Sequence, residues 1–174
     1  MGGADKGLIA LHGKPLITYV IDTVAPQVGT LVINANRNLD QYSALGYPVI
    51  QDTAPGQAGP LAGIASALLA AKTDYVLVVP CDTPYLPHDL VARLAATLTQ
   101  EHADIAVAHD GTRMQPVVAL LKRDSENSLA GDILQSIQRG HNKTERWMHS
   151  QRLALVDFSD QTQAFKNINT PEDM

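Results

Sequence analysis

The chain has 174 residues, of which 45% are hydrophobic and 18% charged, and its formal net charge is −5. This size and composition predict one globular domain with enough apolar material to build a core. An acidic chain without a basic run lacks the clustered Lys and Arg that general nucleic-acid binding requires, which argues against that class of function.

The residue types narrow the fold and the compartment. Aromatic residues make up only 5% of the chain, so the core must be built from Val, Ile, Leu and Ala, which suits a parallel sheet covered by helices. The single Cys81 excludes an internal disulfide and fits a reducing compartment. No apolar run reaches the length of a membrane span, and the first residues do not match a signal peptide. We therefore expect a cytoplasmic protein with no membrane partner.

The first half of the chain alternates helical and extended patterns. Apolar residues at three- and four-residue spacing predict a helix over residues 14–25. Short apolar runs predict strands over 30–35 and 47–52, with a short helix or turn over 36–45 between them. Residues 60–72 predict a further helix, which opens on a proline, a residue that suits the first helical position.

The next part of the chain continues this alternation. Residues 74–80 form the most apolar run of the chain and predict a buried strand. A turn follows, and Pro87 is expected to open another helix. Residues 104–109 and 115–122 predict two strands joined by the turn sequence DGTR, which allows an antiparallel pair.

The last elements complete the pattern. A helix is expected over 125–138, and a final strand over 152–158 follows a polar stretch. The segment NTPEDM reads as a helix start with Thr170 as its N-cap. Alternating strands and helices predict an α/β sandwich with a mostly parallel sheet, and no linker divides it. We therefore expect a single domain over residues 1–174.

Polar residues follow the predicted strands, where ligands bind in open α/β sheets. They are Asn34, Asn36, Asp52, Asp82, Asn167 and Asn169. Among these, Asp82 comes directly after the most apolar strand, in a tight turn flanked by prolines. A carboxylate held there could bind Mg²⁺ together with substrate phosphates, or it could simply cap its own turn.

Lys6 follows the small residues Gly2, Gly3 and Ala4 at the start of the chain. A glycine-rich turn exposes backbone N–H groups to phosphate oxygens, and a lysine adds a positive charge. The pattern does not match either standard phosphate-loop motif, so a flexible terminus is the alternative. The GPLAG segment at 59–63 would let a ligand or another backbone approach a helix start, or would only pack tightly.

Several motifs occur in order along nearly the whole chain: GGADKG, VINAN, QD before GPLAG, VPCDTPYL and FKNINTPED. Together they resemble the molybdenum cofactor guanylyltransferase family. The resemblance implies a Rossmann-like three-layer sandwich with GTP as substrate and Mg²⁺, or alternatively Mn²⁺, as cofactor.

The resemblance also assigns roles to residues of this chain. It implies that Gly3 and Lys6 bind the nucleotide phosphates and that Asn34 and Asp52 hold the guanosine part. It places Asp82 at the metal and, together with Lys6, at the catalytic centre. The resemblance also implies that Asn167 and Asn169 lie on the molybdopterin side.

The implied reaction is the transfer of GMP from GTP to the terminal phosphate of molybdopterin, with release of pyrophosphate. The implied protein partners are other molybdenum cofactor biosynthesis and acceptor proteins, contacted transiently. Alternatives are a CTP-dependent or sugar-phosphate nucleotidyltransferase, and a nucleotide-binding module without catalysis. Family members carry a first strand and glycine loop ahead of MGGADKG, so we expect that strand, that loop and most of a C-terminal helix to be missing from this sequence.

Overall fold

The computed structural model describes residues 5–54 and 59–168. Its largest sheet contains β5 (Tyr75–Val78), β7 (Met114–Lys122), β6 (Ile105–His109) and β8 (Leu153–Asp157), in that order. Strand β7 is antiparallel to both of its neighbours, whereas β6 and β8 are parallel. Consequently β5, β6 and β8 run in one direction and end at the same edge of the sheet.

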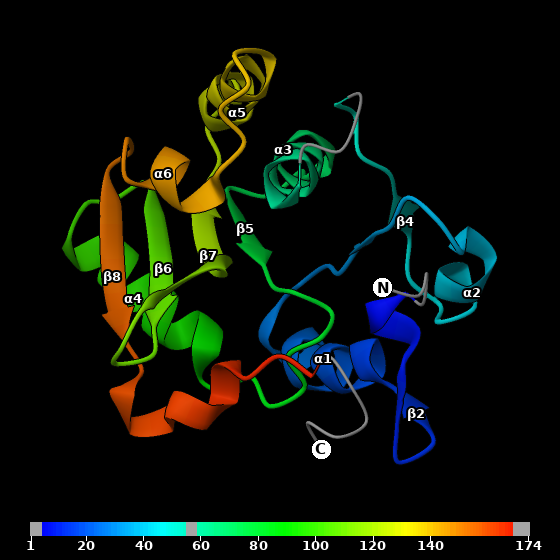
Figure 1. Ribbon diagram of the computed structural model, residues 1–174. Helices are drawn as coiled ribbons and strands as arrows, with labels where there is room; N and C mark the ends of the chain where they lie inside the picture. The colour runs from blue at the N-terminus through cyan, green and yellow to red at the C-terminus, as the bar shows by residue number, and fades with distance from the viewer. Residues whose placement is uncertain (1–4, 55–58, 169–174) are drawn as a thin grey trace.

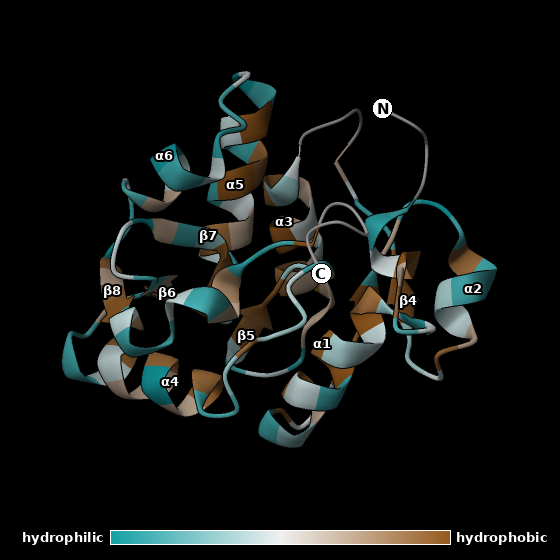
Figure 2. Cartoon of the chain, turned by 60° about the horizontal axis from the view of Figure 1, so that its bottom comes forward, coloured by the Kyte–Doolittle hydropathy of each residue, from teal (hydrophilic) through white to brown (hydrophobic). Residues whose placement is uncertain are grey.

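Helices cover both faces of this sheet. On one face α1 (Leu16–Val24), α4 (Leu90–Gln100) and the 3-10 segment η3 (Ser159–Phe165) share a core with the sheet. On the other face α3 (Pro60–Ala70), α5 (Ser128–Gln138) and α6 (Thr144–Met148) share a second core. Figure 2 shows that hydrophobic stretches are concentrated in the helices and strands, and hydrophilic ones in the connecting loops. The predicted three-layer α/β sandwich is confirmed.

Alternation along β7 explains why one strand serves two cores. Val118 and Leu120 belong to the core beneath α4, whereas Ala119 and Leu121 belong to the core beneath α3 and α5. Successive side chains of a strand point to opposite faces, so an uninterrupted apolar run is suited to a sheet covered on both sides. The antiparallel arrangement that the sequence allowed for this strand is also found.

A smaller group of elements lies beside the large sheet (Figure 1). Here β3 (Ile33–Asn34) pairs in parallel with β4 (Val49–Ile50), and α2 (Leu39–Ser43) packs against them. The buried side chains of this group form a third core with α1, and they are Ile17, Ile21, Ile33 and Tyr42. Both strands are shorter than the sequence predicts, because only two residues of each take part in the ladder.

The chain start forms a turn and a hairpin that the sequence patterns did not predict. The 3-10 turn η1 (Lys6–Leu8) leads into β1 (Ala10–Leu11), which pairs with β2 (Lys14–Pro15). His12 and Gly13 between them both have positive φ, as a tight two-residue hairpin turn requires. The helix predicted from residue 14 therefore begins only at Leu16.

Two further predictions need correction. Residues 74–80 predict a buried strand, but Tyr75 is 49% exposed and only Val76 of β5 is buried. Among the described residues β5 pairs only with β7, so its other edge has no strand neighbour there. The helix predicted to open at Pro87 begins at Leu90, after a turn closed by the hydrogen bond from Leu90 N to Pro87 O.

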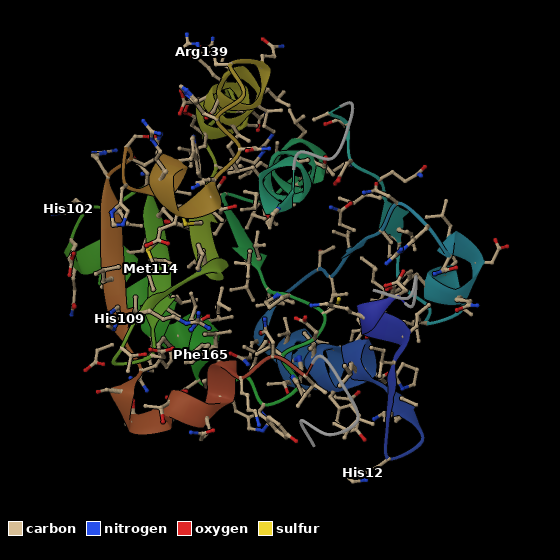
Figure 3. The ribbon with its side chains drawn as sticks, in the orientation of Figure 1. His12, His102, His109, Met114, Arg139 and Phe165 are labelled. Carbon is tan, nitrogen blue, oxygen red and sulfur yellow. The ribbon has the colours of Figure 1, made fainter. Side chains whose placement is uncertain are left out.

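Within the described residues, no helix is long and apolar enough to cross a membrane. The histidines that Figure 3 labels, His12, His102 and His109, lie on separate parts of the molecule. The predicted helix start at 170–174 lies outside the described residues.

Candidate active site

The carboxyl end of β5 carries an ion pair. The Nζ atom of Lys6 lies 3.4 Å from Oδ2 of Asp82, which follows the strand by four residues. The Asp82 side chain is only 9% exposed, whereas the Lys6 side chain is 54% exposed. The structure therefore brings together the two residues to which catalytic roles were assigned, with the carboxylate fixed and the ammonium group reachable from solvent.

The turn that holds Asp82 is tied to the end of the described chain. The backbone N–H of Ile168 donates to the carbonyl oxygen of Asp82 at 2.9 Å. Beside it, the buried hydroxyl of Thr83 donates to Oδ1 of Asn167 at 3.0 Å. Asn167 thus lies next to the turn that holds Asp82.

A second polar group lies at the ends of β3 and β4. Nδ2 of Asn34 donates to Oδ1 of Asp52 at 2.8 Å, and Nδ2 of Asn36 donates to Oδ2 at 2.8 Å. Oδ1 of Asn36 also accepts the backbone N–H of Asp52 at 2.9 Å. Asn34 ends β3 and Asn36 lies in the bend just after it, so both asparagines reach the same carboxylate. Together they fix both oxygens of the carboxylate.

The first turn of α3 closes on this group because Gly63 has no side chain. A Cβ added at Gly63 would lie 2.6 Å from Nδ2 of Asn34 and 3.7 Å from Oδ1 of Asp52. Thr53, the residue after Asp52, is held by Ser66 of α3, whose hydroxyl accepts the backbone N–H of Thr53 at 2.9 Å. The GPLAG segment therefore does permit a close approach, and what approaches is the Asn34–Asp52 pair.

A second glycine contact joins the Lys6 turn to α2. A Cβ added at Gly7 would lie 2.7 Å from the hydroxyl oxygen of Tyr42 and 3.2 Å from Cβ and Sγ of Cys81. Burial, followed by the nearby Asp82 charge, raises the pKa of the Cys81 thiol to about 11. The thiol is therefore protonated at neutral pH and does not act as a nucleophile, which agrees with a packing role.

The donor set around Asp82 suits one kind of metal. In the part of the chain that the structure describes, no group of three His, Cys, Asp or Glu side chains could hold an ion by itself. Mg²⁺ does not need such a group, because it is bound through one or two carboxylates together with substrate phosphates and water. A single buried carboxylate at the strand end fits that requirement.

The predicted site residues fall into two contacting groups. Lys6 and Asp82 form one, with Asn167 beside it, and Asn34 and Asp52 form the other. Gly3 and Asn169 were also predicted to belong to the site, and both lie outside the described residues.

The patterns missed the residues that support these groups. Thr83 orients Asn167, and Tyr42 contacts the turn that carries Lys6. Asn36, predicted among the polar residues after the strands, joins the second group through its bonds to Asp52.

Comparison with known proteins gives a consistent family. Residues 1–154 match the model of the MobA-like NTP transferase domain. The chain is 48% identical over 172 residues to a molybdenum cofactor guanylyltransferase of Shewanella loihica, covering 99% of this chain and 86% of the relative. The same identity and coverages hold for the enzyme of that name from Shewanella sediminis.

Solved structures agree with the fold. A molybdopterin-guanine dinucleotide biosynthesis protein A from Archaeoglobus fulgidus superimposes with a TM-score of 0.77 at 24% identity, over 98% of this chain and 87% of that one. A 2-C-methyl-D-erythritol 4-phosphate cytidylyltransferase from Thermus thermophilus gives 0.70 at 17% identity, over 97% and 89%. At these identities the likeness supports the fold alone.

Proposed function

Because this chain belongs to the family of MobA-like NTP transferase domains, we propose that it transfers GMP from GTP to the terminal phosphate of molybdopterin and releases pyrophosphate. The observation that carries this proposal is the 48% identity, over 99% of the chain, to a relative named for guanylyl transfer in molybdenum cofactor synthesis. We further propose that it acts in the cytoplasm and contacts cofactor biosynthesis and acceptor proteins only transiently.

The two polar groups divide the substrate between them. Asn34 and Asp52, held together at 2.8 Å, bind the guanosine part. The exposed ammonium group of Lys6 binds the phosphates and offsets charge on the departing pyrophosphate. The resemblance gives Gly3 a role at the same phosphates, and Gly3 lies outside the described residues. Asn167, next to the turn that holds Asp82, binds molybdopterin; the same role is proposed for Asn169, which lies outside the described residues.

This division leaves little covalent chemistry to the protein. The acceptor phosphate is already ionised at neutral pH, so the protein needs no general base. Catalysis then depends on holding the attacking oxygen in line with the α-phosphorus and on stabilising the charge of the leaving group. A Mg²⁺ ion bound at Asp82 would supply further positive charge to the phosphates, with Mn²⁺ as the alternative ion.

The test is the substitution Asp82→Asn, assayed by pyrophosphate release from GTP plus molybdopterin. The amide keeps the size of the side chain but removes the charge that holds a cation and pairs with Lys6. We expect turnover to fall by about 100-fold or more and the thermal unfolding midpoint to stay near that of the wild type. Asp74→Asn is the matched control, because Asp74 precedes the opposite end of β5 and its side chain is exposed. Wild-type turnover by Asp82→Asn would refute the assignment.

The alternatives give different results in the same assay. A cytidylyltransferase would release pyrophosphate with CTP in place of GTP, and a sugar-phosphate nucleotidyltransferase would require a sugar phosphate as acceptor. A nucleotide-binding module without catalysis would show a nucleotide-dependent rise in thermal stability but no pyrophosphate. Comparing GTP, CTP and ATP, each without acceptor, with molybdopterin and with a sugar phosphate, distinguishes all of these outcomes.

A further inference from the structure

The turn that carries Lys6 is held from behind by the side chain of Asp5. Oδ1 of Asp5 accepts a hydrogen bond from the hydroxyl of Tyr42 at 2.6 Å. Oδ2 accepts from Nδ2 of Asn38 at 3.2 Å and from Nε of Arg37 at 3.3 Å. The Asp5 side chain is 13% exposed and its bond to Tyr42 is partly buried, whereas the bonds from Arg37 and Asn38 lie at the surface. The residue immediately before the lysine is therefore fixed by three donors from one short segment.

Tyr42 is the buried member of this set. It is 3% exposed and packs in the third core with Ile17, Ile21 and Ile33. Burial and, after it, the hydrogen bond to Asp5 raise the pKa of the Tyr42 hydroxyl well above its usual range, so the hydroxyl stays protonated and donates. Its ring is held by the core, which leaves the hydroxyl in one place.

The turn itself fits against this hydroxyl. The backbone N–H of Leu8 donates to the carbonyl oxygen of Asp5 at 3.0 Å, closing the 3-10 turn around Lys6. A Cβ at Gly7 would come within 2.7 Å of the Tyr42 oxygen, so any residue larger than glycine would displace either the turn or the tyrosine. The hydroxyl thus contacts the residues on both sides of Lys6.

The same segment also carries part of the second polar group of the site, Asn34, Asn36 and Asp52, which we call the nucleoside group. Asp52 is held by Asn34 and Asn36. These asparagines come just before Arg37, Asn38 and Tyr42 in the chain. One stretch of chain, residues 34–42, therefore contacts both the carboxylate of the nucleoside group and the turn of the phosphate lysine. The same backbone segment therefore holds both the turn of Lys6 and the side chain of Asp52.

We propose that Tyr42 and Asp5 are positioning residues, which we call the Tyr42–Asp5 clamp, and that the clamp sets the distance between the nucleoside group and Lys6. The clamp thereby places the ammonium group of Lys6 in contact with the β- and γ-phosphates of a nucleotide that Asn34 and Asp52 hold. This inference rests on the proposed function for the identity of the nucleotide, but it concerns only how the chain aligns base and phosphates.

The experiment compares Tyr42→Phe with wild type by the affinity for GTP and for GMP, and by the kcat and KM for GTP. Phenylalanine keeps the buried ring and removes only the bond to Asp5. GMP lacks the phosphates that Lys6 meets, so we expect its affinity to change less than about twofold, whereas GTP binds about tenfold more weakly, as the loss of one hydrogen bond to a charged group predicts. We also expect kcat to fall. Equal weakening of both nucleotides would mean that Tyr42 only supports the fold and would overturn the proposal.

Two further variants sharpen the result. Tyr47→Phe is the matched control, because Tyr47 packs at the edge of the same core and no hydrogen bond joins its hydroxyl to a described residue. It should keep the wild-type ratio of GTP to GMP affinity. Asp5→Ala should lower that ratio at least as far as Tyr42→Phe, and the double variant should be no worse than Asp5→Ala alone. Additive losses in the double variant would contradict a shared clamp.

Failure of the clamp and failure of the proposed function give different results. If the wild type releases no pyrophosphate from GTP plus molybdopterin, the proposed reaction is wrong. The ratio of triphosphate to monophosphate affinity still tests the clamp in that case, with whichever nucleotide the wild type binds. If the wild type is active and Tyr42→Phe keeps both its ratio and its kcat, the clamp is wrong and the reaction stands.

Discussion

Replacing Gly63 by alanine should weaken nucleotide binding without weakening the fold. The added Cβ would lie 2.6 Å from Nδ2 of Asn34, whereas ordinary contact begins at 3.4 Å. The neighbour that must move is the end of an asparagine side chain, so the helix can stay in place while the amide shifts. A shift of that size breaks the 2.8 Å hydrogen bond from Asn34 to Asp52.

The substitution should lower the affinity for nucleotide while leaving the stability of the fold nearly unchanged. Inside a helix, alanine is more favourable than glycine by up to about 1 kcal/mol, which offsets the lost side-chain hydrogen bond. Binding has no such compensation, because both displaced groups are the ones assigned to guanosine. Losing one or two hydrogen bonds at about 1 kcal/mol each lowers the affinity for GTP by about 5- to 30-fold. The thermal unfolding midpoint should remain within a few degrees of wild type.

Isothermal titration with GTP and thermal unfolding of the same samples measure both quantities. Gly131→Ala is the matched control: Gly131 lies inside α5, and nothing stands within 4 Å of the position its Cβ would take. It should raise stability and leave affinity unchanged. If Gly63→Ala binds GTP as tightly as Gly131→Ala does, the assignment of Asn34 and Asp52 to the nucleoside is refuted.

Two other predictions concern Thr83 and Asp110. Thr83→Val removes the donor to Asn167 and should raise the KM for molybdopterin while leaving that for GTP unchanged, as steady-state kinetics would show; an equal change in both would argue against an acceptor-side role. Although burial opposes it, hydrogen bonds from Thr112, Arg113 and Gln115 lower the pKa of Asp110, so this carboxylate stabilises the fold fully above about pH 4 and progressively less as the pH falls further. Asp110→Asn should cost about 1–3 kcal/mol at neutral pH and flatten the acid limb of a urea-unfolding series, and an unchanged acid limb would contradict this.

Local patterns predicted the parts of the fold that local forces determine. The run QPVVALLK became the long strand β7, because its alternating side chains fill two cores at once. The DGTR sequence became the turn between β6 and β7, in which Asp110 accepts the backbone N–H groups of Thr112 and Arg113. In both cases the signal in the sequence lies in residues within a few positions of each other.

Other elements in the first part of the chain were missed or were predicted longer than they are. The β1–β2 hairpin needs positive φ at His12, which no apolar pattern encodes. Strands β3 and β4 are shorter than their apolar runs, because a strand ends where its partner ends and not where its hydrophobicity ends.

In the site, too, contacts between residues far apart in the sequence could not be predicted. Asp82 and Lys6 were each suspected from their own surroundings, but the ion pair joins residues 76 positions apart. The bond between Tyr42 and Asp5 spans 37 positions and left no trace in either local pattern. Strand ends can be predicted to converge, since the topology of an α/β sheet requires it. Which side chains then meet depends on packing that no single segment determines.

The combination of a fixed turn and a weak ion pair is what a phosphate-binding lysine requires. At 3.4 Å, the Lys6–Asp82 contact is longer than a strong charge-assisted hydrogen bond, and the Lys6 side chain is 54% exposed. Such a contact contributes no more than about 1 kcal/mol, so a phosphate can replace Asp82 as the partner of Lys6 at little cost, which leaves the carboxylate to a cation. The backbone of the turn has no such freedom, because Asp5 holds it to residues 37–42. A lysine whose charge can change partners while its turn stays in place can meet the phosphates without losing its alignment to the nucleoside.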